Sequence, residues 1–447
     1  MELLNDNSVC LFLLEGTSIL HYGKLIHSET NITLEQVALV TKGVVFKNNR
    51  WHCVQCETDD DKYFHRYYSD FINKDIVYCR KCIQLGRMDH LTDYRIIKSH
   101  QKVTPCEYHL EFALSDQQSY ASQQIVKAIM ERRKLLLYAV TGAGKTEMIF
   151  EGIKFARNQG DNIAIVSPRV DVVVEISQRI KNAFIHEDID VIHQSSQQQF
   201  DGHFITSTIH QLYRYKNHFD TIIIDEVDAF PLSMDDDLFK VIQSSSKQNA
   251  CHIYMTATPP QKLLSTISKD NVIKLPARFH RQPLPVPIFQ YLKFKPKQVQ
   301  FKLLNFLSKQ IQHQRYTLVF FNHIDHMIKA FKTYQSQIPN LIYIHSEDEQ
   351  RFEKVQSLRA GNHMVVFTTT ILERGFTMEK LDVVVIEADQ FSKAALIQIA
   401  GRVGRKKQAP NGNVVYYHNG VSLSMMLARK DIKKMNQLAK QKGWLDI

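Results

Sequence analysis

The sequence has no hydrophobic run long enough to cross a membrane. Its N-terminal apolar patch, residues 9–14, is short and follows the acidic residues Glu2 and Asp6. A spanning helix needs about 20 apolar residues, and a secretory signal opens with positively charged residues. The sequence therefore predicts no transmembrane segment and no secretory signal, and we expect a cytoplasmic protein.

Cysteine is scarce as well, with seven in 447 residues. Thiols stay reduced in the cytoplasm, so we expect no disulfides. Four of the seven form two C-x-x-C pairs, Cys53 with Cys56 and Cys79 with Cys82. Two such pairs offer four thiolates to a tetrahedral zinc ion, although the gap between them is slightly longer than in most zinc ribbons. Because neither pair opens a helix in a βαβ pattern, a structural zinc module at residues 51–92 is favoured over a redox motif.

A surplus of acidic residues is also absent. Lys and Arg total 56 against 46 Asp and Glu, which gives a net charge of +10 and a pI near 9.0. This mild excess suits a polyanionic partner, but an ordinary solvated surface explains it equally well. Basic and aromatic residues interleave at Lys62–Tyr68, between the cysteine pairs. They could stack on nucleic-acid bases or form the core of a small hairpin. We assign no chemistry to the N-terminal region, residues 1–50.

The segment Ala139–Thr146 reads AVTGAGKT and lies between a buried-strand pattern at 134–140 and helix-like apolar spacing that stops at Gly160. A strand, a glycine loop and a helix in this order form a cradle for phosphate. Lys145 would reach the β- and γ-phosphates of ATP, and the Thr146 hydroxyl would hold Mg²⁺. Ala139 stands where the first glycine of this motif is usual. The other predicted nucleotide-binding residues of the loop are Thr141, Gly142, Ala143 and Gly144.

Carboxylates follow another apolar strand pattern further along the chain. The carboxyl ends of parallel strands are where open α/β sheets bind ligands. We therefore expect Asp225 to hold Mg²⁺ and Glu226 to orient and deprotonate the attacking water. Gln118, shortly before the phosphate loop, would read adenine through its side-chain amide. Thr256 and Thr258 end a further strand and are suited to relaying the state of the nucleotide.

Beyond a proline-rich linker at 277–287, strand and helix patterns alternate again and predict a second parallel sheet without a phosphate loop. Its chemistry lies in Gln398-Ile-Ala-Gly-Arg-Val-Gly-Arg405. On one helix, Gln398, Arg402 and Arg405 would share a face. We predict that they form an arginine-finger device aimed at the γ-phosphate. A basic surface helix is the plain alternative, and it explains the glutamine less well.

These motifs, together with Thr368–Thr377, occur in the order found in superfamily 2 helicases and translocases, and the motor resembles PriA-like and DEAD-box-like enzymes. A four-cysteine module ahead of a two-lobed motor resembles the ComFA family of late-competence ATPases. The resemblance implies an α/β fold with two RecA-like parallel-sheet lobes in tandem, at 110–280 and 288–447, preceded by the small zinc module.

The resemblance also implies a function. It is the ATP-driven import of single-stranded DNA through a ComEC-type membrane channel, with ComFC as a partner, at the inner face of the cell membrane. A homo-oligomer is compatible with this role. We expect no separate wedge domain, and hence translocation with little duplex unwinding. The residues predicted to grip the strand are Pro168, Arg169, Thr208, Asn322 and Thr369.

Two other functional classes stay open. A PriA-like replication or repair helicase would use the same motor motifs, and so would an RNA-remodelling ATPase. A zinc-bearing nucleic-acid-binding protein with an inert motor is disfavoured, because Lys145, Asp225, Glu226 and Arg405 are all present.

Overall fold

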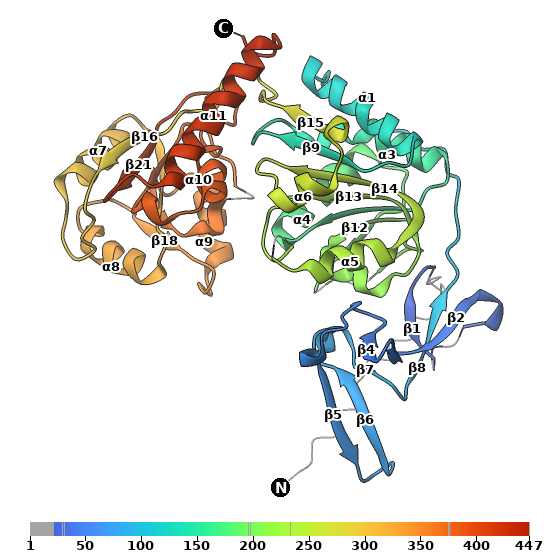
Figure 1. The fold of residues 1–447 in the computed structure, drawn as a ribbon. Coiled ribbons are helices and arrows are strands. Elements are labelled where there is room, and N and C mark those ends of the chain that lie inside the picture. The colour runs from blue at the N-terminus through green and yellow to red at the C-terminus, as the bar shows by residue number, and fades with distance from the viewer. Residues whose placement is uncertain are drawn as a thin grey trace.

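The computed structural model of the chain describes residues 22–446 except 29, 31, 195, 197, 233, 374 and 375. The N-terminal apolar patch at 9–14 lies outside these residues, as do Arg374 and Gly375 of the predicted Thr368–Thr377 motif. Figure 1 shows two α/β lobes side by side, with a small β module below the first lobe. The predicted fold class, two parallel-sheet lobes preceded by a four-cysteine module, is confirmed.

The β module contains three small groups of antiparallel strands. One sheet pairs β8 (Asp93–Ile97) with β1 (Leu25–His27) and β2 (Val37–Lys42), a hairpin joins β3 (Val44–Lys47) to β4 (Arg50–Cys53), and a third group contains β5 (Phe64–Ser69), β6 (Lys74–Cys79) and β7 (Met88–Asp89). Strands β1 and β2, which precede the cysteines in the sequence, therefore share a sheet with a strand that follows them.

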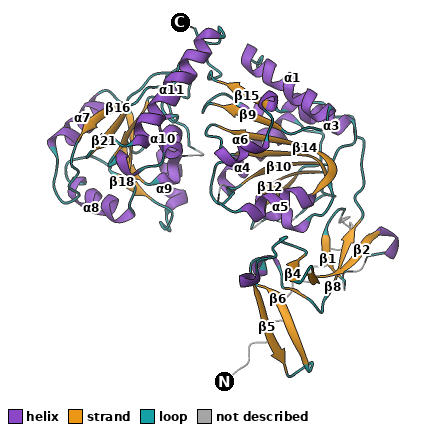
Figure 2. Ribbon diagram, in the orientation of Figure 1, coloured by secondary structure: helices purple, strands orange, loops and turns teal. Residues whose placement is uncertain are grey.

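The first lobe has a seven-stranded parallel sheet in the order β11-β12-β10-β13-β14-β9-β15. Helices pack on both of its faces (Figure 2). Its central strands are fully buried apolar runs, as parallel strands covered on two sides require. In chain order the elements are α1 (Asp116–Met130), β9 (Leu135–Ala139), α2 (Lys145–Met148), α3 (Phe150–Asn158), β10 (Ile163–Ser167), α4 (Val170–Ala183), β11 (Asp190–Ile192), β12 (Phe204–Thr208), β13 (Phe219–Asp225), α5 (Asp236–Ser245), β14 (Ser246–Thr256), α6 (Gln261–Thr266) and β15 (Val272–Leu275).

The second lobe has a six-stranded sheet in the order β16-β21-β20-β17-β19-β18, again parallel throughout. In chain order its elements are β16 (Ile288–Tyr291), α7 (Phe301–Gln312), β17 (Tyr316–Phe320), α8 (Ile324–Tyr334), β18 (Ile342–Ile344), α9 (Arg351–Arg359), β19 (Val365–Thr368), β20 (Leu381–Val385), α10 (Lys393–Ala400), β21 (Val414–His418) and α11 (Leu423–Gln441). The predicted linker at 277–287 has no helix or strand between β15 and β16.

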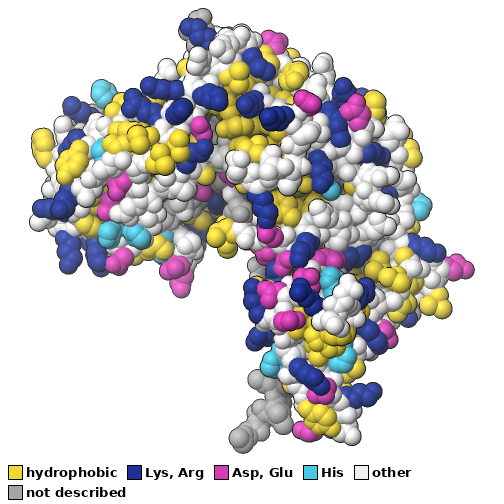
Figure 3. All heavy atoms as spheres, viewed as in Figure 1, with side chains coloured by type: hydrophobic (Ala, Val, Ile, Leu, Met, Phe, Trp, Pro, Cys, Tyr) yellow, Lys and Arg dark blue, Asp and Glu magenta, His cyan; other side chains and the backbone are white. Residues whose placement is uncertain are grey.

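The β module is docked on the first lobe through charged and apolar contacts. Lys81 lies 2.6 Å from Asp237 and 3.3 Å from Asp235, at the start of α5. Lys216 of the first lobe donates to the Gln55 carbonyl at 3.3 Å. The four cysteines belong to the same buried cluster as apolar residues of that lobe. On the face drawn in Figure 3, an open hollow lies between the module and the second lobe.

Candidate ATP-hydrolysis site and metal centre

The phosphate loop connects the buried strand β9 to α2, as its sequence predicts. Gly142 and Gly144 adopt the left-handed conformation, with φ of 81° and 72°. A Cβ on Gly144 would overlap the Gln118 side chain, so this position requires glycine for both its backbone angle and its space. The helix that follows is divided at Ile149 into α2 and α3, where the sequence predicts one continuous helix.

Gln118 lies against the phosphate loop. Its Nε2 donates to the Gly144 carbonyl at 3.3 Å, and its Oε1 accepts from the Ser115 backbone at 3.0 Å. Ser115 in turn caps α1, and the pair forms a capping box. The structure therefore brings Gln118 to the nucleotide loop, while adenine recognition by its amide stays a prediction.

The predicted catalytic carboxylates meet the loop lysine at the carboxyl end of β13. Lys145 Nζ lies 2.8 Å from Asp225 Oδ1 and 3.4 Å from Glu226 Oε1. Burial alone would lower the pKa of the Lys145 ammonium, but the two carboxylates outweigh it and raise that pKa. Burial raises the pKa of Asp225, against the opposing effect of Lys145. Glu226 has a φ of 54°, an uncommon backbone conformation that is found in functional sites.

Asp228 connects three of the predicted sequence motifs. Its carboxylate accepts hydrogen bonds from the hydroxyls of Thr256, at 2.5 Å, and Thr258. Gln398 of the second lobe donates to the same carboxylate at 3.4 Å. The predicted relay residues and the predicted glutamine of the second lobe therefore meet at one group, across the boundary between the lobes.

The predicted shared helix face of Gln398, Arg402 and Arg405 is wrong. Helix α10 ends at Ala400, and Gly401 follows it as the C-cap. Residues 401–405 form what we call the arginine turn, in which Gly404 has a φ of 67°. The helix thus ends between Gln398 and both arginines, and the left-handed conformation that glycine commonly adopts after a helix is found at Gly404.

The two arginines have different surroundings. Arg402 is 2% exposed and donates to the carbonyls of Glu373 at 2.7 Å and Phe376 at 2.6 Å. Arg405 Nε donates to the Gly401 carbonyl at 2.9 Å. Burial lowers the pKa of Arg405, and the negative charge of Glu226 opposes this, so Arg405 lies within electrostatic reach of the carboxylate predicted to activate water. Arg405 is thus the arginine whose surroundings fit a finger.

A residue that sequence reasoning missed lies at the same junction. Arg278, in the predicted linker, donates to the Gly404 carbonyl at 2.7 Å and to the Gly401 carbonyl at 3.4 Å. His280 also lies 2.9 Å from the Gly404 carbonyl. A charged residue in a proline-rich linker is ordinarily solvated, so no local pattern marks Arg278.

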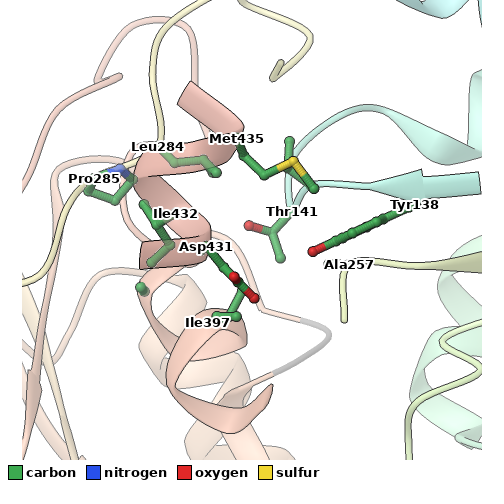
Figure 4. Close-up of a pocket in the computed structure, with 12 residues that line it drawn as sticks. Tyr138, Thr141, Ala257, Leu284, Pro285, Ile397, Asp431, Ile432 and Met435 are labelled. Carbon is green, nitrogen blue, oxygen red and sulfur yellow. The ribbon is translucent and has the colours of Figure 1, made fainter. Parts of the chain in front are cut away.

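A mainly apolar cavity lies at the boundary between the two lobes (Figure 4). Met435 and Ile432 of α11 enter it from the second lobe, opposite Tyr138 and Thr141 of the first. A Cβ on Gly401 would overlap the Thr141 side chain. The arginine turn is therefore in close contact with the phosphate loop.

The four predicted metal ligands form a compact buried cluster. The sulfurs of Cys53 and Cys82 are 3.6 Å apart, those of Cys56 and Cys79 are 3.7 Å apart, and all four lie within 4.8 Å of one another. Zn–S bonds of about 2.3 Å in a tetrahedron place sulfurs about 3.8 Å apart. The cluster therefore fits a tetrahedral zinc ion.

Comparisons with known proteins agree with this arrangement. The family model for the ComFA N-terminal domain matches residues 14–95. The models for the type III restriction enzyme res subunit and for the helicase conserved C-terminal domain match 111–261 and 299–407. The competence protein ComFA of Bacillus subtilis is 37% identical over 408 residues, covering 89% of this chain and 88% of that protein. ComFA of Streptococcus pneumoniae is 33% identical, covering 81% and 86%. The chain belongs to the ComFA family.

Solved structures show the same motor fold as this ComFA-family chain. Dbp5 of S. cerevisiae bound to RNA and ADP BeF3 superposes with a TM-score of 0.52 at 14% identity, over 72% of this chain and 92% of that one. The Mycobacterium smegmatis helicase Lhr bound to ssDNA and AMP-PNP gives 0.51 at 17% identity, over 73% and 50%. Together with the family matches to the res subunit and the helicase C-terminal domain, this two-lobed fold supports an ATP-hydrolysing enzyme. Over the described part of the chain, no helix has both the length and the apolar character of a membrane span.

The predicted strand-gripping residues of this ComFA-family chain lie at the carboxyl ends of adjacent strands. Pro168 and Arg169 follow β10, and Thr208 ends the neighbouring strand β12. In the second lobe, Asn322 and Thr369 come shortly after β17 and β19, which are also neighbours. Their contacts with nucleic acid stay predictions.

Proposed function

We propose that this ComFA-family chain is a Mg²⁺-dependent ATPase that moves along single-stranded DNA and drives its uptake during competence. The observation that carries the proposal is the division of one site between two lobes. Lys145, Asp225 and Glu226 come from the first lobe. From the second lobe, Gln398 donates to Asp228, and the arginine turn that carries Arg405 packs against Thr141 of the phosphate loop. Hydrolysis at such a site changes the contacts between the lobes and so produces motion.

The residues present fit a magnesium nucleotide. Asp225, Glu226 and Asp228 bring three carboxylates to the carboxyl end of β13, where Lys145 forms ion pairs with the first two. A divalent cation, held by Asp225 and the Thr146 hydroxyl, would add positive charge beside these carboxylates. It would also neutralise charge on the phosphates.

Each protein group then has a distinct task. Lys145 would leave the carboxylates for the β- and γ-phosphates. Glu226 would orient the attacking water and take its proton, and Arg405 would stabilise the negative charge that develops on the γ-phosphate. Arg402 donates to the carbonyls of Glu373 and Phe376, so we assign it to holding these two residues rather than to the phosphate.

Coupling between hydrolysis and the DNA strand is supported by a contact between the lobes. Arg169 Nη2 donates to the Ile371 carbonyl of the second lobe at 3.3 Å, while its Nε bonds Asp171 at 3.1 Å. Arg169 therefore changes its surroundings whenever the lobes move. The strand would be gripped at Pro168, Arg169 and Thr208 on one lobe and at Asn322 and Thr369 on the other.

The cysteine cluster would hold one structural zinc ion, which fixes the β module against the first lobe. From the family, we also propose a ComEC-type channel and ComFC as partners, and a location at the inner face of the membrane. A homo-oligomer is compatible with this role. The net charge of +10 is consistent with a polyanionic track.

ATP turnover tests this proposal when it is measured without polymer and with single-stranded DNA, duplex DNA and RNA. We expect single-stranded DNA to stimulate most. Arg169→Ala should weaken that stimulation and leave basal turnover unchanged. Lys181→Ala, at an exposed site on helix α4, which Arg169 precedes, should change neither the stimulation nor the basal turnover. Stronger stimulation by RNA would favour the RNA-remodelling alternative, and efficient unwinding of long duplexes would favour a PriA-like helicase.

A further inference from the structure

Arg278 is a buried guanidinium placed between the phosphate loop and the arginine turn. It lies just after β15, at the end of the first lobe, and is 1% exposed. The next residue, Phe279, donates its backbone N–H to the Gly142 carbonyl of the phosphate loop at 3.0 Å. One short segment therefore holds the phosphate loop on one side and the arginine turn on the other.

The contacts of Arg278 with the arginine turn are specific. Its two terminal nitrogens donate to the carbonyls of Gly404, at 2.7 Å, and Gly401, at 3.4 Å. The guanidinium presents its donors in a rigid planar fork that suits two fixed carbonyls, whereas the donors of a lysine ammonium rotate freely at the end of a flexible stem. Gly404 has no space for a side chain, because a Cβ there would overlap the Pro410 carbonyl. Arg278 therefore bonds two carbonyls of the arginine turn that are three residues apart.

The electrostatic setting argues against a purely structural role. Among the described residues, no carboxylate forms an ion pair with Arg278, and its Nε has no hydrogen-bond partner. Burial, with a contribution from the nearby charge of Arg405, lowers the pKa of Arg278 to about 9. A buried cation without a carboxylate partner costs stability, so another requirement must keep it in place.

Arg278 and Arg405 are linked through a hydrogen-bond acceptor that they share. The Gly401 carbonyl accepts from Arg405 Nε at 2.9 Å and from Arg278 at 3.4 Å. Any shift of that carbonyl moves the Arg405 side chain with it.

We propose that Arg278 is a positioning residue for ATP hydrolysis, which holds the arginine turn against the phosphate loop and thereby sets where Arg405 points. This inference rests on the proposed role of Arg405. A small misplacement of a catalytic group costs up to about 100-fold in rate. Arg278→Gln should therefore lower kcat for ATP by about tenfold to 100-fold and leave the KM for ATP within about threefold.

The test is steady-state ATP turnover of the full chain with saturating single-stranded DNA, for Arg278→Gln, Arg278→Lys, Arg405→Ala and the double variant. Arg278→Lys keeps the charge but replaces the rigid fork with a flexible ammonium group, so its kcat should lie between those of the wild type and Arg278→Gln. In the double variant, Arg278→Gln should add little to the loss caused by Arg405→Ala, since residues that act through each other are not additive. Arg281→Gln is the matched control. It lies in the same segment but contacts Asp446, the Gly443 carbonyl and Asp116, none of which belongs to the phosphate loop or the arginine turn, so its kcat should be unchanged.

The outcomes distinguish a failure of the proposed role of Arg278 from a failure of the proposed role of Arg405. Normal kcat in Arg278→Gln, or losses that multiply in the double variant, would overturn the inference while the proposed motor stands. Near-normal turnover of Arg405→Ala would instead refute the finger role and remove the basis of this inference. If Arg278→Gln does not fold, Arg278→Lys decides, because a full wild-type kcat with lysine would refute a role for the two-carbonyl fork.

Discussion

Gln398→Ala tests whether the two lobes communicate through Asp228. The glutamine donates across the lobe boundary to this carboxylate at 3.4 Å. A hydrogen bond to a charged group contributes about 1.5–3 kcal/mol. The lower end applies here, because 3.4 Å is long and because Asp228 keeps its bonds to Thr256 and Thr258. If removing this hydrogen bond destabilises the arrangement in which the two lobes meet by about 1.5 kcal/mol, kcat should fall roughly tenfold.

The assay is ATP turnover with saturating single-stranded DNA, beside the affinity for a fluorescent ATP analogue. Affinity should change little, because the first lobe alone supplies the phosphate loop. Gln390→Ala is the control, since this glutamine is exposed in the second lobe and bonds Glu387 and His323 of its own lobe. A Gln398→Ala enzyme with kcat within about twofold of the wild type would refute the reasoning, provided that its thermal midpoint is also unchanged.

The other predictions concern chemistry, zinc and pH. Glu226→Gln should keep ATP binding and lose turnover, because the amide cannot take the proton of the attacking water. If this isosteric variant still hydrolyses ATP, another group acts as the base. Cys53→Ala should lose one zinc ion per chain, as measured by metal analysis, and should have a lower thermal midpoint of unfolding. The reason is that structural zinc supplies roughly 10–16 kcal/mol of apparent binding free energy in small modules. Wild-type protein without stoichiometric zinc would contradict the site. Burial lowers the pKa of His218 from 6.5 to about 3 and of His203 to about 4. Between these folded-state pKa values and 6.5, the unfolded chain therefore binds more protons than the folded chain. The free energy of unfolding, measured in urea, should fall as pH falls from about 6.5 towards 4. A free energy of unfolding that is constant over this pH range would contradict the burial of neutral histidines.

Local sequence determined the strands and the loop chemistry. Apolar runs such as 163–167 and 221–224 are buried on both faces, and only a parallel sheet covered by helices accommodates them. The glycines of the phosphate loop and the spacing of the four cysteines likewise constrain the backbone within a few residues. Such short-range patterns predict an element and its chemistry without knowledge of the rest of the chain.

Spacing alone misplaced the arginines, although a local signal was available. Gln398, Arg402 and Arg405 have helical spacing, yet the helix ends at Ala400, and two glycines, Gly401 and Gly404, lie in the segment that follows. Glycine costs backbone entropy inside a helix and is favoured just beyond its end. In the turn that results, Arg402 donates to the carbonyls of Glu373 and Phe376, while Arg405 stays within electrostatic reach of Glu226.

Only the tertiary structure decided which distant segments meet. The pairing of β1 and β2 with β8, the bond from Gln398 to Asp228 and the burial of Arg278 all join residues far apart in the chain. A guanidinium in a proline-rich linker is predicted to be solvated, because burying its charge is costly. Arg278 is buried because folding brings the carbonyls of Gly401 and Gly404 to it from the other lobe, and no pattern within the linker records that approach.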